Sequence, residues 1–95
     1  MKILVHSEAE EDLADAYSWY EHKSLGLGND FLLCVEVALK QIERNSEAFQ
    51  IVHKKVRRAL LKRFPYGVFY VTNKNEILVI AVFHAKRNPR VWKKR

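Results

Sequence analysis

The stretch VRRALLKRFPYGVFYVTNKNEILVIAVFH, residues 56–84, decides the fold of this chain. It contains three runs rich in Val, Ile, Leu, Phe and Tyr, at 56–64, 67–72 and 76–84. Pro65-Tyr66 separates the first two runs and Asn73-Lys74-Asn75 separates the last two, and both separators have the composition of turns. The stretch therefore predicts an antiparallel meander of three strands. Its third run is apolar from Ile77 to Phe83 without alternation, which is typical of a strand in the interior of a sheet, covered on both faces.

Upstream of this meander, the chain begins with a short strand and a helix. Residues 2–5 are mostly aliphatic and indicate the strand, and Ser7-Glu8-Ala9-Glu10 has the form of a capping box that starts the helix. Four acids crowd the first turns, where the helix dipole favours negative charge. One face of this helix is expected to carry the apolar side chains of Ala9, Leu13, Ala16, Tyr17 and Tyr20.

A second helix follows Gly26 and Gly28, which interrupt the first helical period. Its apolar face is expected to consist of Phe31, Leu32, Val35, Ala38, Leu39 and Ile42. A short glycine turn between two helices predicts an antiparallel hairpin. The fold class is then α+β, a single domain over residues 1–95 with an N-terminal strand, a helical hairpin packed on one face of a small antiparallel sheet, and a basic C-terminal tail. We expect the other sheet face to present basic side chains.

Charge divides the chain after Glu47. The first part carries ten acids and four bases, and the second carries thirteen bases and one acid, Glu76, within a net charge of +6. A basic working surface for a polyanionic partner is expected. The candidate anion-binding and target-binding residues are Arg57, Arg58, Lys62, Arg63, Lys86, Arg87, Arg90 and Trp92.

These cations also have a plainer interpretation, as the solvated face of an edge strand that charge protects from aggregation. Their excess over acids is larger than solubility requires, so we favour a binding role. Strand alternation places Arg58 and Lys62 on one face and Arg57 and Arg63 on the other. Which face is exposed is left open by the sequence.

Two further residues have open roles. His84 ends the third strand, beside two bases. It is either an acid or base that works near neutral pH, or a structural residue that hydrogen-bonds a turn and fixes the tail. Trp92 either stacks on a partner or pins the tail to the helices.

The remaining composition narrows the cellular setting. A single cysteine, Cys34, excludes an intramolecular disulfide and fits a reducing cytosol, and the N-terminus has neither a secretory signal nor a membrane span. We therefore expect a cytoplasmic protein without a membrane partner. His6, His22 and His53 show no ligand spacing with one another or with Cys34, so no metal site and no cofactor are expected.

As a set, several motifs resemble the RelE/ParE superfamily of bacterial type II toxins. The resemblance spans nearly the whole chain and rests on the order of elements and on four segments: Leu13 to Tyr20, Gly26 to Phe31, Val56 to Tyr70 and Ala81 to Trp92. It implies a small toxin that slows growth by acting on DNA gyrase or on ribosome-bound mRNA. It also implies a cognate antitoxin, which we expect to be acidic and to join the toxin in an oligomer.

Two positions favour the gyrase-directed, ParE-like branch. Relatives that cleave mRNA carry an arginine at the position of Gly67, and a lysine pair that falls near Arg58 and Leu60 in this chain. The resemblance therefore predicts gyrase inhibition by binding, without a catalytic step. The alternative is a ribosome-dependent endoribonuclease, with His84 as acid or base and Arg58, Arg63 and Arg87 as charge stabilisers.

Overall fold

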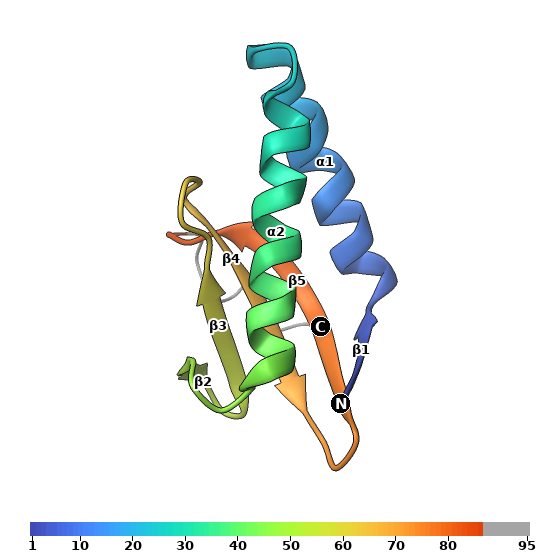
Figure 1. Cartoon of the computed structure of the whole chain (residues 1–95), viewed down its shortest axis with the longest axis vertical. Helices are drawn as coiled ribbons and strands as arrows, with labels where there is room; N and C mark the ends of the chain where they lie inside the picture. Colours follow the sequence, from blue (N-terminus) through green and yellow to red (C-terminus); the bar gives the residue numbers. More distant parts are fainter. Residues whose placement is uncertain (87–95) are drawn as a thin grey trace.

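The computed structural model describes residues 1–86 of the chain. A five-stranded sheet carries two helices on one face (Figure 1). In chain order the elements are β1 (Lys2–Val5), α1 (Ser7–Lys23), α2 (Leu27–Arg44), β2 (Gln50–His53), β3 (Val56–Leu60), β4 (Tyr66–Thr72) and β5 (Glu76–His84). The α+β class, the initial strand, the helical hairpin and the meander are confirmed.

The strand order is β1-β5-β4-β3-β2, with β1 parallel to β5 and every other pair antiparallel. The prediction that β5 lies inside the sheet is confirmed, since β1 and β4 flank it. The sequence missed β2, because four residues of mixed polarity carry little strand signal. It also extended the first run of the meander too far: β3 ends at Leu60, and the backbone N–H of Leu61 then donates to the carbonyl of Tyr66 across a tight connection.

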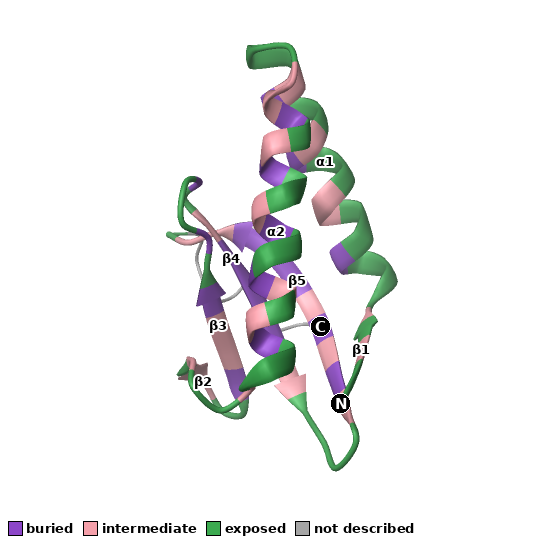
Figure 2. Cartoon of the chain, in the orientation of Figure 1, coloured by how far each residue is buried: buried purple, intermediate pink, exposed green. Residues whose placement is uncertain are grey.

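The sheet face opposite the helices differs from the expectation of a basic surface. It holds a second apolar cluster built on Val56, Phe69, Ala81 and Phe83, all buried. Strand alternation explains the result, because β4 and β5 are apolar on both faces and only one of the two adjacent arginines, Arg58, projects to this side. In Figure 2 the buried positions accordingly run along β5 as well as along α2.

The main core lies between the helices and the sheet and includes a cluster of four aromatic rings. Phe31 of α2 lies 5.4 Å from Tyr20, 5.3 Å from Phe64 and 5.1 Å from Tyr66, measured between ring centroids. Tyr20 in turn packs edge-on against Phe64 at 4.8 Å. These rings join both helices to the β3–β4 connection, so the connection is held in place by the core.

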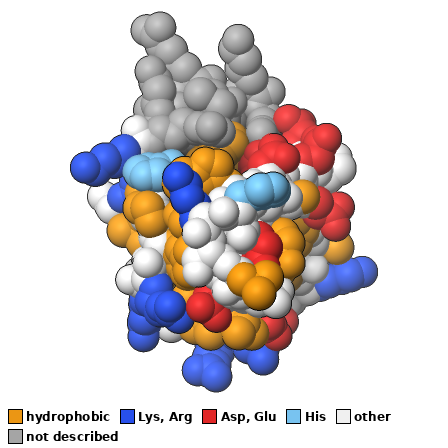
Figure 3. Space-filling view, turned by 90° about the horizontal axis from the view of Figure 1, so that it is seen from above, with side chains coloured by type: hydrophobic (Ala, Val, Ile, Leu, Met, Phe, Trp, Pro, Cys, Tyr) orange, Lys and Arg blue, Asp and Glu red, His pale blue; other side chains and the backbone are white. Residues whose placement is uncertain are grey.

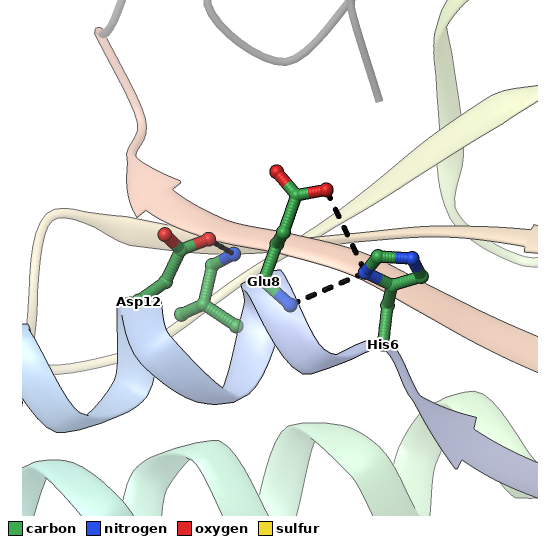
Figure 4. Close-up of polar contacts among 4 residues, drawn as sticks. His6, Glu8 and Asp12 are labelled. Carbon is green, nitrogen blue, oxygen red and sulfur yellow. Dashed lines mark hydrogen bonds and ion pairs between the residues drawn. The ribbon is translucent and has the colours of Figure 1, made fainter.

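The N-terminus of α1 is capped differently from the capping box expected at Ser7. His6 is the cap: its Nδ1 accepts from the backbone N–H of Glu8 at 3.2 Å and lies 3.9 Å from Glu8 Oε1 (Figure 4). Ser7 is already the first helical residue. A ring nitrogen can satisfy an orphan amide as a hydroxyl does, which sequence patterns for caps do not include.

The turn between the helices depends on a carboxylate from α1. The cap residue of α2, Gly26, has a φ of +90° and no side chain, and the two oxygens of Glu21 accept from the backbone N–H groups of Gly26 and Gly28, each at 3.0 Å. A negative group at a helix N-terminus is favoured by the dipole and by the unpaired amides. The predicted glycine turn is therefore confirmed, with Glu21 as its added fastening.

Replacing Tyr70 with phenylalanine should lower the free energy of unfolding by about 1–2 kcal/mol at pH 7. The buried hydroxyl donates to the carbonyl of Ser46 at 2.6 Å. Burial raises the pKa of the Tyr70 phenol above its ordinary value of 10.0, although Arg57 opposes the shift. Because the unfolded phenol then loses its proton first, wild-type stability falls as pH rises above about 10.

The measurement is denaturant unfolding of both proteins between pH 7 and 11. The gap between wild type and Tyr70→Phe should stay constant to about pH 9 and narrow above it. A gap that widens at high pH would contradict the assigned direction of the shift.

Candidate functional site

Part of the predicted basic surface gathers at one end of the sheet. Lys62 and Arg63 lie in the connection after β3 and are exposed, and Lys86 follows β5. Tyr66 pairs with His84, and the backbone N–H of Ala85 donates to the carbonyl of Pro65 at 2.7 Å. These bonds bring the two segments, and the three cations with them, to the same end of the molecule.

Arg57 and Arg58 lie elsewhere, on opposite faces of β3. The Arg57 guanidinium donates to the backbone carbonyls of Phe49 at 2.7 Å and Glu47 at 3.1 Å, and so fastens the connection between α2 and β2. The aliphatic stem of Arg58 lies over Gly67 on the second apolar cluster. The opposite orientation of these two residues agrees with the alternation expected from sequence. The extension of that alternation to Lys62 and Arg63 is wrong, because β3 ends at Leu60 and both residues lie in the connection after it.

The predicted cations are not neutralised by the acidic N-terminal half. Of Arg57, Arg58, Lys62 and Arg63, only Arg63 forms an ion pair with an acid in residues 1–86, with 3.7 Å between its Nη2 and Asp30 Oδ2. Both side chains of this pair are well exposed, so water screens it and it adds little to stability. Seen from above, acidic side chains gather on one side of the molecule, and Lys and Arg are spread around its rim (Figure 3).

Three of the candidate residues cannot be placed. Arg87, Arg90 and Trp92 lie outside the described residues, as does most of the predicted basic tail. Their binding roles remain predictions from sequence.

His84 makes the local hydrogen bond that was one of its two expected roles. Its Nδ1 accepts from the backbone N–H of Lys86 at 3.2 Å, and its ring lies 5.7 Å from that of Tyr66. It lines a cavity of about 340 Å³ between α1 and β5, and Asp12 and Asp15 are also among the lining residues. Two carboxylates repel a phosphate, so this cavity does not suit a scissile RNA backbone.

Asp12 of α1 forms a hydrogen bond with the backbone of β5. β1 pairs with β5 only as far as Val79, and beyond that point the Asp12 Oδ2 accepts from the backbone N–H of Val82 at 3.0 Å (Figure 4). The helix thereby continues the edge of the sheet with a side-chain acceptor. The sequence gives this acid only a dipole role, because a contact across 70 residues leaves no local pattern.

A groove between α2 and β3 exposes apolar side chains that the sequence analysis missed. Leu33 and Val37 of α2 and Leu60 of β3 are 59%, 51% and 54% exposed, and they line a cavity of about 220 Å³. The other lining residues are Asp30, Cys34, Ala38, Gln41, Lys62 and Arg63. The sequence signal that could have revealed this groove is the spacing of four residues between Leu33 and Val37, which places both on one face of the helix. That face lies next to the core-facing residues of α2, most of which were predicted correctly.

Leu32 marks the limit of that assignment. It was expected on the core face of the second helix, and it is 38% exposed, whereas Phe31, Val35, Ala38 and Ile42 are buried. Apolar residues occupy a wider arc of α2 than one buried face needs, so periodicity alone could not separate the inner from the outer residues.

Neither α1 nor α2 is long and apolar enough to cross a membrane. Across residues 1–86, no three His, Cys, Asp or Glu side chains come together in a group suited to a metal ion.

Comparison with known proteins identifies the family. A family model described as "ParE toxin of type II toxin-antitoxin system, parDE" matches residues 3–89. The chain belongs to the ParE toxin family. The expectation of a RelE/ParE toxin nearer the ParE branch is confirmed, and this ParE family member is the toxin of a type II toxin-antitoxin system.

Individual relatives agree with this assignment. Toxin ParE2 from two strains of Mycobacterium tuberculosis, CDC 1551 / Oshkosh and ATCC 25618 / H37Rv, is 32% identical over 89 residues, covering 93% of this chain and 85% of the relative. A solved structure, described as the chromosomal ParDE TA system from P. aeruginosa, superposes with a TM-score of 0.69 over 88% of this chain and 95% of that one. At 20% identity, this structural match shows the shared fold.

Proposed function

We propose that this ParE family toxin arrests growth by binding DNA gyrase, without cleaving a substrate, and that an acidic antitoxin neutralises it in a hetero-oligomeric complex. The observation that carries the proposal is the packing around Gly67. A Cβ at this position would lie 2.9 Å from Arg58 Cγ and 3.1 Å from Arg58 Cδ. The place where mRNA-cleaving relatives carry an arginine is therefore filled by the stem of a neighbouring side chain.

The positions of the other candidate catalytic groups support the same conclusion. His84 lines a cavity together with Asp12 and Asp15, Arg58 lies over Gly67 on the face of the second apolar cluster, and Arg63 lies beside Asp30. Phosphoryl chemistry on RNA needs a base, an acid and a cation converging on one phosphate. The described groups are dispersed over three sites, which favours action by binding.

Binding to the target is assigned to Lys62, Arg63 and Lys86, with the unplaced cations of the tail. These exposed charges suit an anionic macromolecular surface, where complementary charge speeds association. An antitoxin that covers Lys62 and Arg63 would neutralise the toxin by removing part of this surface.

The test is supercoiling of relaxed plasmid by purified gyrase, with and without the isolated toxin. We expect inhibition that increases with toxin concentration and is reversed by prior addition of the antitoxin. The double charge reversal Lys62→Glu/Arg63→Glu should weaken inhibition by about tenfold or more, through slower association.

Matched charge reversals at Lys2 and Lys40, which are exposed elsewhere, serve as the control and should inhibit as the wild type does. Full supercoiling activity with toxin in excess would overturn the proposed target. Primer extension on translated mRNA examines the alternative function: codon-positioned cuts that disappear in His84→Ala would establish a ribosome-dependent endoribonuclease instead.

A further inference from the structure

The cavity between α1 and β5 takes no part in the proposed function. It has a volume of about 340 Å³, and aromatic rings line it. The rings of Trp19 and Tyr20 on α1 are perpendicular, with 5.1 Å between their centroids, and Tyr66 of β4 lies 5.9 Å from Tyr20. Trp19 is more than half exposed, so a ligand from solvent has access to its ring. Aromatic faces attract cations and stack with planar groups.

The charge of the cavity lining is opposite to that of the whole chain. Asp12 and Asp15 are lining residues, and no lysine or arginine of residues 1–86 joins them, although the net charge is +6. Both acids lie beyond the first turn of α1, where the helix dipole has little effect. Asp12 accepts from the backbone N–H of Val82, whereas the Asp15 carboxylate forms no hydrogen bond or ion pair within residues 1–86. The lining therefore combines aromatic rings with a carboxylate that no described residue neutralises.

One of these rings already contacts a cation of the chain itself. The Nζ of Lys23, one turn further along α1, lies 4.6 Å from the centroid of the Trp19 ring. Lys23 is not a lining residue, and it forms no ion pair with an acid of the described chain. The Trp19 ring thus accepts positive charge, and the negative charge of the lining is left for a second cation.

We propose that the α1–β5 cavity binds an arginine side chain of a partner protein through its guanidinium group. A guanidinium is planar, stacks on aromatic rings and donates two parallel N–H bonds to a carboxylate, whereas an ammonium is a compact and strongly hydrated charge. In this cavity the guanidinium stacks on Trp19 and donates to Asp15. The inference goes beyond the proposed function, because it uses none of the cations assigned to gyrase. It is tested on the isolated toxin, so its failure would leave the gyrase proposal intact.

Trp19 fluorescence measures occupancy of the cavity. Trp92 is the other tryptophan, so the variant Trp92→Phe leaves Trp19 as the single reporter. The probe is Nα-acetylarginine amide, whose guanidinium is its only charge, in about 150 mM salt to screen distant charges. We expect a saturable change with a dissociation constant on the order of 1 mM. The amide NMR resonance of Val82, whose N–H donates to Asp12, should shift with the same constant.

The matched probe for the guanidinium group is Nα-acetyllysine amide. It carries the same charge, and it should bind at least about threefold more weakly because an ammonium neither stacks nor forms two parallel bonds. Equal binding of the two probes would overturn the assignment to arginine. The absence of saturation at about tenfold the expected dissociation constant would overturn the site.

Substitution of Asp15 tests the carboxylate. Asp15→Asn should raise the dissociation constant of the arginine probe by about tenfold, because a charged acceptor is replaced by a neutral one. Asp15 is exposed and has no side-chain partner in residues 1–86, so the variant should keep the wild-type circular dichroism spectrum. Glu36→Gln, at an exposed position of α2 outside the lining, removes the same charge and should change the constant less than about twofold. Equal effects of both variants would mean general charge attraction and would overturn the site.

The chain contains another source of the same chemical group. Arg87, Arg90 and Arg95 lie outside the described residues. If a partner supplies the arginine, the full-length variant Arg87→Gln/Arg90→Gln/Arg95→Gln should bind the probe as the wild type does. A variant that binds at least about threefold more tightly would show competition by these arginines, and would overturn the partner as the source.

Discussion

Replacing Phe31 with alanine should lower the free energy of unfolding by about 3–5 kcal/mol, the largest effect that we expect from any single substitution in this chain. Phe31 is fully buried, and its ring lies within 5.4 Å of Tyr20 and Tyr66 and of Phe64, measured between centroids. Alanine buries less apolar surface than phenylalanine and leaves a cavity, which the three neighbouring rigid rings cannot move to fill. Domains of this size are stable by only about 5–15 kcal/mol, so the variant approaches the unfolding threshold.

Urea denaturation at pH 7 measures this effect, with the midpoint falling and the slope unchanged if unfolding stays two-state. Phe31→Leu is the control, since it keeps most of the volume and should cost less than half as much. A loss below about 1 kcal/mol for Phe31→Ala would mean that the aromatic cluster does not couple the helices to the β3–β4 connection. Because that connection carries Lys62 and Arg63, Phe31→Ala should also weaken the proposed target binding through these two cations.

The second large effect is expected at Gly28, where the first turn of α2 lies against Tyr17 of α1. A Cβ at Gly28 would lie 2.8 Å from the backbone oxygen of Tyr17 and 2.8 Å from two atoms of its ring. The ring can rotate, but the backbone oxygen cannot move without separating the helices. Gly28→Ala should therefore lower the free energy of unfolding by about 1–3 kcal/mol, even though alanine favours helices by up to about 1 kcal/mol.

Thermal unfolding is the measurement, because about 1 kcal/mol corresponds to a shift of 4–8 °C in Tm for a domain of this length. Gly28→Val should lower Tm further than Gly28→Ala, since two more methyl groups enter the same contact. Asn29→Ala, at the exposed neighbouring position of α2, is the control and should leave Tm unchanged or slightly raised. A stabilising Gly28→Ala would show that the interhelical contact is looser than described.

The elements that sequence predicted well are those whose burial repeats within a few residues. Periods of 3.6 located the two helices, and apolar runs bounded by turn residues located β4 and β5. Features that depend on one residue or on a very short segment were predicted less well. The first helix is capped by His6 and not by Ser7, and β2 has too few residues to give a recognisable strand pattern. Sequence patterns for helix caps reflect which residue types most often cap a helix. Here a histidine, which is a less common cap, accepts the hydrogen bond from the backbone N–H of Glu8.

The site was predicted less well than the fold. Composition showed that the C-terminal half is basic, but only strand alternation and the turn after β3 decide where each charge projects. The Arg57 guanidinium donates hydrogen bonds to the carbonyls of Glu47 and Phe49, whereas Lys62 is exposed at the edge of the α2–β3 groove. Neither outcome could be read from the spacing of bases in the chain.

By itself, the sequence determined the α+β class, the order of its main elements, the family resemblance and the excess of positive charge, because each follows from composition or from short-range periodicity. Tertiary structure alone decided the groove of Leu33, Val37 and Leu60, the apolar character of the second sheet face and the filling of the space over Gly67 by Arg58. These features join residues from different elements, and their positions depend on how close packing brings those elements together.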